Sequence, residues 1–209
     1  YIGVNGVARL FFCGYSKSLS YRGNTDRGFY KGRKYLASAN VGDYIIFGGG
    51  TVSNDGDAYT GMLEIYDTSL SKMDSTLLLS PGRQHLASAS VGDYAVFCGG
   101  WNSANAGNGT NAEQYAANAY DSALSMTEIP KLEEPRHSLA SASNETLALF
   151  AGGINGETYS DKVEAYTDTL TKSDADGLTS GAMGLFGGSV RRYMLFGGGR
   201  NRDGSIGTV

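Results

Sequence analysis

One short pattern recurs four times along the chain and limits the folds that it can adopt. Each copy is an apolar run that ends in a phenylalanine and glycines, and the four phenylalanines are Phe47, Phe97, Phe150 and Phe196. They stand 50, 53 and 46 residues apart. Self-similarity at a fixed period is typical of chains built from stacked copies of one supersecondary unit. The sequence therefore predicts a repeat architecture.

The repeated unit is longer than the phenylalanine and its glycines. Residues 33–50, 83–100 and 136–153 nearly copy one another, and residues 182–199 form a degenerate fourth copy. A second unit, Tyr-x-x-x-Leu-Ser/Thr, recurs between these copies and once near the N-terminus, beginning at Tyr15, Tyr66, Tyr120 and Tyr166. The chain thus holds four copies of each half-unit.

Each period contains the pattern of four short strands. In the first period these are a small-residue strand from Leu36 to Ala39, an apolar run over 44–47, an alternating run over 62–66 and a weaker strand around 72–78. Strands at this spacing, separated by turn residues, are typical of an all-β chain. Glycine makes up 31 of the 209 residues. Because glycine inside a helix costs about 1 kcal/mol per site, this content disfavours a helical bundle.

Four strands in every period of roughly 50 residues predict a β-propeller of four-stranded antiparallel blades. The residue types agree with that prediction. The innermost strand crowds the central axis and carries Ala-Ser-Ala in the first three copies. The glycines stand where a Cβ atom would obstruct close packing. Phe47, Tyr66 and their equivalents supply large rings to fill the space between blades.

These residues resemble the kelch repeat. The resemblance rests on four Phe-x-Gly-Gly-like segments in register with four Tyr-x-x-x-Leu units and covers essentially residues 7–209. It implies a kelch-like propeller. One feature departs from the family's pattern: kelch repeats usually carry a tryptophan on the outer strand, whereas the single tryptophan, Trp101, follows a glycine pair.

The repeat boundaries define the expected blades. Residues 33–80, 83–132 and 136–178 make three, and we expect 182–209 and 1–32 to combine into a composite blade, so that 1–209 forms one four-bladed domain. An alternative stays open. Val209 follows Phe196 by the same interval that separates Val163 from Phe150. The chain thus stops where its own third strand would begin, as in a piece of a larger ring.

Composition excludes several kinds of partner. The formal net charge is -4, from 17 basic and 21 acidic residues, without a dense Lys/Arg stripe. Nucleic acid is therefore not an expected partner. No apolar run reaches the ~18 residues of a membrane helix, so we expect no membrane insertion. The cysteines, Cys13 and Cys98, are far apart and predict free thiols.

The sequence carries no recognised catalytic or cofactor motif. There is no phosphate-binding glycine loop, His-Glu-x-x-His or Gly-x-Ser-x-Gly pattern. Residues 54–57 resemble the start of a calcium loop, but Ile65 occupies the position of its final glutamate. We therefore expect no catalytic residue, metal or cofactor.

The loops offer the best candidates for a binding site. In an antiparallel blade, the loops that follow each glycine pair share one face with the segment that enters each inner strand. Loops on a rigid scaffold commonly carry binding residues. The candidate residues on this face are Arg33, Asp55, Asp57, Arg83, His85, Trp101, Asn102, Arg136, His137, Asn155, Glu157 and Arg200. The alternatives are structural: the histidines as a polar lining of the propeller mouth, and Trp101 as a plug or cap.

Residues 1–9 add a clue about context. They resemble a short segment of tail-associated proteins from phages and prophages of Gram-positive gut bacteria. The resemblance implies a virion, cell-surface or extracellular location and a recognition or architectural role.

Three functions follow as hypotheses. The first is a non-catalytic propeller that binds a protein or glycan at the loop face, with self-association as a further interaction. The second is an enzyme similar to kelch-type sugar mutarotases, with Arg83, Arg136, Asp55 and Glu157 around a central funnel. The third is a purely architectural tail component.

Overall fold

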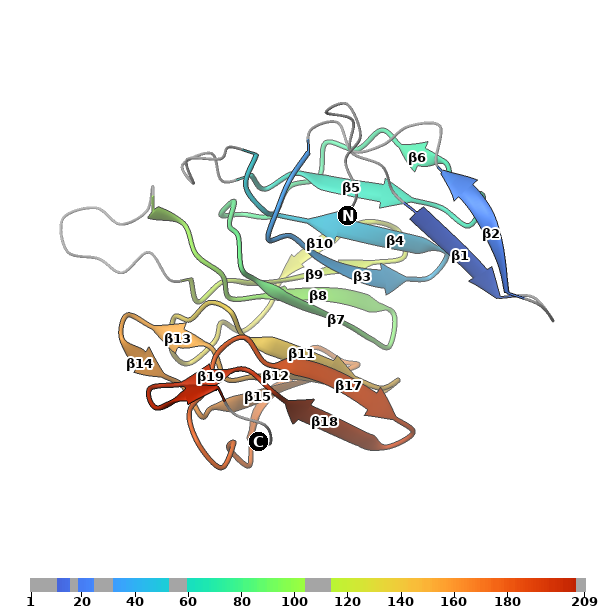
Figure 1. Ribbon diagram of the computed structural model, residues 1–209. Coiled ribbons are helices and arrows are strands. Elements are labelled where there is room, and N and C mark those ends of the chain that lie inside the picture. The colour runs from blue at the N-terminus through green and yellow to red at the C-terminus, as the bar shows by residue number, and fades with distance from the viewer. Residues whose placement is uncertain (1–10, 16–18, 25–31, 53–59, 104–113, 206–209) are drawn as a thin grey trace.

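The computed structural model is an arc of antiparallel β-sheets arranged side by side (Figure 1). It describes residues 11–15, 19–24, 32–52, 60–103 and 114–205. Three sheets have four strands each, and a further hairpin begins a fourth unit. The all-β propeller prediction is confirmed, with blades of the predicted type.

The first two blades have the same strand order. Each runs from an inner strand through two middle strands to an outer strand, and every neighbouring pair is antiparallel. The first blade comprises β3 (Ala37–Val41), β4 (Tyr44–Gly48), β5 (Leu63–Tyr66) and β6 (Lys72–Met73). The second comprises β7 (Ala87–Val91), β8 (Tyr94–Cys98), β9 (Ala117–Asp121) and β10 (Met126–Glu128).

The third blade carries an extra hairpin between its middle strands. It comprises β11 (Ala140–Ser143), β12 (Leu147–Ala151), β15 (Val163–Thr167) and β16 (Lys172–Ala175), with the hairpin β13 (Ile154–Asn155) and β14 (Thr158–Tyr159). The fourth unit has β17 (Phe186–Val190) and β18 (Tyr193–Gly197), followed by the small hairpin β19 (Arg200–Asn201) and β20 (Gly204–Ser205).

The N-terminal part adds a separate hairpin, β1 (Phe11–Tyr15) and β2 (Leu19–Asn24). It forms a two-stranded sheet of its own, as do β17 and β18. Figure 1 draws β1 and β2 at the first-blade end of the arc and β17 and β18 at the other end. The composite blade and the total of four blades therefore stay predictions.

Serine side chains join the inner strands to one another. Ser88 Oγ donates to the Ser38 carbonyl at 2.7 Å, and Ser141 Oγ donates to the Ser88 carbonyl at 2.6 Å. Gly187 stands at the equivalent position in the fourth unit, where a Cβ atom would lie 2.1 Å from the Ser141 carbonyl oxygen. The small residues predicted for the inner strand are thus explained by how closely these strands approach.

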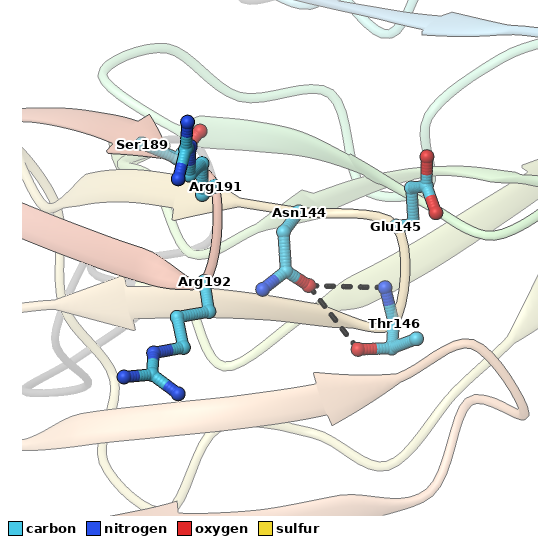
Figure 2. A pocket seen from close by; sticks show the side chains of 6 residues that line it. All are labelled: Asn144, Glu145, Thr146, Ser189, Arg191 and Arg192. Carbon is cyan, nitrogen blue, oxygen red and sulfur yellow. Dashed lines mark hydrogen bonds between the residues drawn. The ribbon is translucent and has the colours of Figure 1, made fainter.

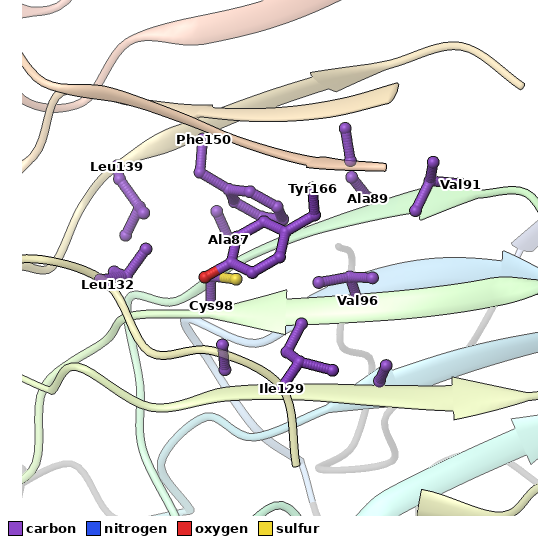
Figure 3. Close-up of a cluster of buried hydrophobic side chains, with 13 residues drawn as sticks. Ala87, Ala89, Val91, Val96, Cys98, Ile129, Leu132, Leu139, Phe150 and Tyr166 are labelled. Atoms are coloured by element: carbon purple, nitrogen blue, oxygen red, sulfur yellow. The ribbon is translucent and has the colours of Figure 1, made fainter. Parts of the chain in front are cut away.

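The hydrophobic core lies between successive blades. One cluster joins Val96 and Cys98 of the second blade to Phe150 and Tyr166 of the third (Figure 3). Within each blade the predicted phenylalanine and tyrosine meet edge to face, with ring centroids 5.8–6.1 Å apart; the pairs are Phe47–Tyr66, Phe97–Tyr120 and Phe150–Tyr166. These rings are the expected fillers between blades.

The glycine pairs stand where the chain of the next blade passes. Gly49 and Gly152 have φ values of +74° and +65°, and a Cβ atom on either would lie 2.5 Å from a backbone carbonyl oxygen, of Arg83 and Ala182 respectively. Each of those residues opens the following repeat. The glycines therefore provide both a left-handed backbone and room for the neighbouring blade.

The expectations about membrane helices and about free cysteines can be compared with the described residues only. Among them, no helix has the length and hydropathy needed to span a bilayer. Cys98 is a buried free thiol. The side chain of Cys13 and the tail-like segment 1–9 lie outside the described residues.

Candidate functional site

A turn with unusual backbone geometry precedes each inner strand. Tyr35, His85 and Ser138 occupy equivalent positions with φ of 60°, 54° and 55°, and Gly184 has 66°. A left-handed conformation is uncommon for residues other than glycine. Because the conformation recurs in every unit, it belongs to the scaffold, and only the side chains differ between blades.

Backbone hydrogen bonds join these turns from blade to blade. The His85 N–H donates to the Tyr35 carbonyl at 3.0 Å, and the Ser138 N–H donates to the His85 carbonyl at 2.8 Å. The Gly184 N–H continues the series to the Ser138 carbonyl at 2.9 Å. This chain of bonds fixes the spacing of the side chains at the start of the inner strands.

Four of these side chains form a group that we call the mouth cluster: Lys34, Tyr35, His85 and His137. The rings of Tyr35 and His85 stack with centroids 4.0 Å apart at 25°. The His85 and His137 ring centroids are 5.8 Å apart, and Lys34 Nζ lies 5.5 Å from the centre of the Tyr35 ring. Tyr35 is 49% exposed and the histidines are half-buried. Tyr35 and Lys34 are thus the exposed members of the cluster, and the two histidines are partly covered.

Partial burial changes the chemistry of His85. Desolvation, with smaller effects of His137 and Lys34, lowers the pKa of His85 to about 4. The imidazole is therefore neutral at pH 7 and has one nitrogen to donate and one to accept a hydrogen bond. His137 Nδ1 lies 2.9 Å from Ser138 Oγ, which orients the second ring.

The segment after each glycine pair lies beside a segment that enters an inner strand. Isolated antiparallel bridges pair Gln84 with Trp101 and His137 with Ile154. The same bridge pairs Lys34 with Thr51 and Met183 with Arg200. The structure thus brings the two predicted sets of segments, the post-glycine loops and the strand-entering segments, to one face.

The predicted loop residues have different roles on this face. Trp101 is half-buried, and Asn102 is buried with its amide donating to the Gly82 carbonyl, so Asn102 holds its own loop. Asn155 is half-buried in β13, and Glu157 is exposed in the turn that follows. Arg200 is exposed. Asp55 and Asp57 lie outside the described residues.

Three of the four predicted arginines face the interior of the blades. Arg83 and Arg136 are completely buried, and Arg33 is 8% exposed. Their guanidinium groups are used by the scaffold, so the expectation that they contact a ligand on the loop face is corrected. We assign them a structural role.

The buried arginines bond to backbone carbonyls and to a side chain on the third strand. Arg33 Nη1 donates to the Gly49 and Met62 carbonyls, and Arg33 Nη2 pairs with Glu64 at 2.7 Å. Arg136 forms the equivalent ion pair with Glu164. Each carboxylate also accepts a bond from a lysine on the outer strand, Lys72 or Lys172.

The second blade replaces the carboxylate by an amide. Arg83 Nη2 donates to Asn118 Oδ1 at 2.9 Å and to the Phe97 carbonyl, and Arg83 Nε donates to the Gly99 carbonyl at 2.7 Å. Burial here lowers the pKa of Arg83 to about 10. The partners at 64, 118 and 164 were missed from sequence, although each stands two residues before the repeated tyrosine.

Sequence reasoning also missed Lys34 and Tyr35. The repeat pattern contained a signal for both. Tyr35 is the repeat equivalent of His85 and Ser138. Lys34 precedes Tyr35 just as His137 precedes Ser138. Their importance depends on contact between blades, which the repeat pattern alone does not define.

A hollow lies at the opposite end of the inner strands from the mouth cluster. It has a volume of about 500 Å³ and is lined by Asn144, Glu145, Thr146, Ser189, Arg191 and Arg192 (Figure 2). Asn144 Oδ1 accepts bonds from the Thr146 N–H, the Thr146 hydroxyl and the Leu147 N–H. The amide oxygen is thus engaged by its own turn, and the mouth cluster is the stronger candidate site.

No metal centre is found in the part of the chain that the structure describes. There, no three His, Cys, Asp or Glu side chains are grouped so that they could hold an ion. The mouth cluster supplies two imidazoles but no third such ligand. Its arrangement suits hydrogen bonding and ring stacking.

Comparison with known proteins supports the fold. Among solved structures, the chain is similar to YjhT, a kelch-type β-propeller protein, with a TM-score of 0.72 at 14% sequence identity. The match covers 92% of this chain and 66% of that one, so the chain spans a little under two thirds of its neighbour. No family model and no curated protein matches the sequence. The similarity establishes a kelch-type propeller fold.

Proposed function

We propose that this kelch-type propeller is a non-catalytic binding module that recognises a glycan at the mouth cluster. The observation that carries the proposal is the exposed stack of Tyr35 on His85, with His137 beside it. The scaffold accounts for the turn that holds these residues but not for the exposed rings that they carry.

The chemistry of the cluster fits a sugar ring. The Tyr35 face offers an apolar surface, and the neutral His85 ring and the Lys34 ammonium offer hydrogen bonds to hydroxyl groups. Ligand sites commonly combine such aromatic surfaces with a few convergent polar groups. Trp101 and Arg200 belong to loops at the same face and extend the surface on which a longer ligand would lie.

The experiment compares binding of a glycan array by the wild-type protein and by Tyr35→Ala and His85→Ala. Any glycan retained by the wild type is then titrated calorimetrically. We expect each variant to weaken binding by about tenfold, because a stacked aromatic contact contributes roughly 0.5–1.5 kcal/mol beyond its buried area.

The matched control is Met126→Ala, which removes an exposed apolar side chain from the outer strand β10. It should bind as the wild type does. Absence of any glycan ligand, or equal binding by all four proteins, would contradict the proposal.

The alternative is an enzyme similar to kelch-type sugar mutarotases, which the fold permits. Two of the residues assigned to it, Arg83 and Arg136, are completely buried and bonded to the scaffold. We therefore expect anomers of simple sugars to equilibrate at their spontaneous rate in the presence of the protein. Faster equilibration, followed by NMR, would favour the enzyme. A virion-associated role rests on residues 1–9 alone and stays a hypothesis.

A further inference from the structure

The charge of the mouth cluster is positive. Lys34 contributes an exposed ammonium group, which lies 5.5 Å from the centre of the Tyr35 ring. His85 and His137 gain positive charge when they are protonated. Tyr35 contributes an uncharged ring. At neutral and acidic pH the cluster therefore has positive charge to offer a ligand and no negative charge.

Lys34 differs from the other lysines of the described structure in having no acidic partner. Each of the others forms an ion pair with a glutamate at 2.5–3.7 Å; these lysines are Lys72, Lys131, Lys162 and Lys172. Within the residues that the structure describes, Lys34 forms no ion pair, and its contact is with the Tyr35 ring. Glu157 stands in the turn between β13 and β14 and is not its partner. The ammonium group is thus available to an acidic group of a ligand.

His85 responds to the same positive charge. Burial is the main cause that lowers its pKa, and the positive charges of His137 and Lys34 add to the effect. Tyr35 of the first blade stacks on the His85 ring, and His137 of the third blade lies 5.8 Å away. No carboxylate contributes to the shift. An anion bound here would meet unbalanced positive charge in a partly desolvated place, where charges interact more strongly than in water.

The geometry places the positive charge beside the ring on which a sugar would lie. A cation within about 6 Å of a ring centre is held there by the ring itself. A sugar in contact with Tyr35 therefore brings its substituents close to the Lys34 ammonium. That group has three hydrogen-bond donors and no acceptor, and its bonds to anionic oxygens are stronger than its bonds to neutral ones. Its best partner is a carboxylate, sulfate or phosphate oxygen.

We propose that the glycan bound at the mouth cluster is anionic, and that its acidic group pairs with the Lys34 ammonium while a sugar ring lies against Tyr35. This inference rests on the proposed function and adds the chemical class of the ligand. Carboxylate, sulfate and phosphate groups share the chemistry that Lys34 recognises, and the experiment distinguishes them.

Three pairs of oligosaccharides separate the charge from the sugar. They are oligogalacturonate and its methyl ester, a sulfated galactan and its desulfated form, and phosphorylated and unphosphorylated oligomannose. In at least one pair, the wild-type protein should bind the charged member about tenfold more tightly than the neutral one. Raising NaCl from about 50 mM to about 500 mM should reduce that preference, because salt screens exposed charges. Calorimetric titration measures each affinity.

Substitutions at Lys34 connect the preference to one side chain. Lys34→Gln should weaken binding of the charged member about tenfold and leave binding of its neutral counterpart almost unchanged. Lys34→Arg keeps the positive charge and should retain the preference. The matched control is Lys131→Gln, which removes an exposed lysine that pairs with Glu128 of β10. It should bind both members as the wild type does, and circular dichroism should show that all three variants are folded.

His85 provides a second readout, which does not depend on affinity. In the free protein its pKa is about 4. A bound anion favours the protonated ring and should raise this pKa, whereas a neutral glycan adds only burial and should lower it further. Proton NMR titration of His85, with and without the charged oligosaccharide, measures the direction of the shift.

The outcomes separate this inference from the proposed function. Equal binding of both members of every pair, or tighter binding of the neutral members, overturns the inference and leaves glycan binding in place. An equal loss of charged and neutral binding in Lys34→Gln also overturns it, as does a bound charged glycan that lowers the pKa of His85. A protein that binds neither these oligosaccharides nor any glycan on the array contradicts both.

Discussion

Arg136 forms a completely buried ion pair with Glu164, across the interior of the third blade. The two residues are 28 positions apart in sequence and meet because β15 pairs with β12. Lys172 Nζ reaches the other carboxylate oxygen at 2.6 Å. The pair joins the start of the blade to its third strand.

Removing one member of this pair should destabilise the protein strongly. We expect Glu164→Gln to lower the free energy of unfolding by about 3–5 kcal/mol, because it leaves the Arg136 charge buried without its counter-charge. Urea denaturation measures the change. The control is Glu133→Gln, since Glu133 forms a half-exposed pair with Lys162 and its loss should have a much smaller effect. Equal effects of the two substitutions would contradict the structural role of Arg136.

The low pKa of His85 predicts a pH-dependent stability. The unfolded chain protonates His85 near pH 6.5, whereas the folded protein does so only near pH 4. The unfolded state therefore binds more protons between these values, and stability should fall as the pH is lowered through this window. His85→Gln should remove that part of the dependence. The measurement is urea denaturation of both proteins at several pH values. The same dependence of the free energy of unfolding on pH in both proteins would refute the prediction.

Two glycines separate the cost of backbone conformation from the cost of a clash. Gly152 and Gly156 have similar φ values of +65° and +59°, but only at Gly152 would a Cβ atom meet a neighbour, the Ala182 carbonyl oxygen at 2.5 Å. Gly156→Ala should cost about 1–2 kcal/mol for the left-handed backbone. Gly152→Ala should cost clearly more. Thermal unfolding of the pair checks this, and an equal loss at both sites would argue against the close blade contact.

Cys98 should be chemically inert in the folded protein. It is fully buried in the cluster between the second and third blades, and burial raises the pKa of its thiol to about 12. Because the thiolate is the reactive form, a Cys13→Ser variant should not react with a thiol reagent at neutral pH until it unfolds. The measurement is the rate of labelling with and without denaturant. Rapid labelling of the native variant would show that the blades separate there.

The strand pattern of the blades could be predicted from the sequence with good accuracy. The expected run over 44–47 is β4, and the expected run over 62–66 contains β5. The glycine pairs and the Phe–Tyr pairs have the predicted roles. These features follow from local alternation and from a repeat that forces equivalent residues into equivalent environments.

The candidate site was predicted only in part. His85 and His137 lie together at the start of adjacent inner strands, and Trp101 lies beside them. The arginines at the same segments lie instead inside the blades. An arginine next to a predicted loop has no local signal for its direction, since that direction depends on partners about 30 residues further along the chain.

The sequence by itself determined the period, the strands and the residues that fill the space between blades, because these depend on patterns within one repeat. The tertiary structure decided which polar residues are buried and which rings meet. Arg83 is buried because β9 brings Asn118 to it, and Tyr35 stacks on His85 because a left-handed turn recurs in neighbouring blades. Contacts between repeats depend on how one blade is rotated against the next, and no pattern within a single repeat encodes that rotation.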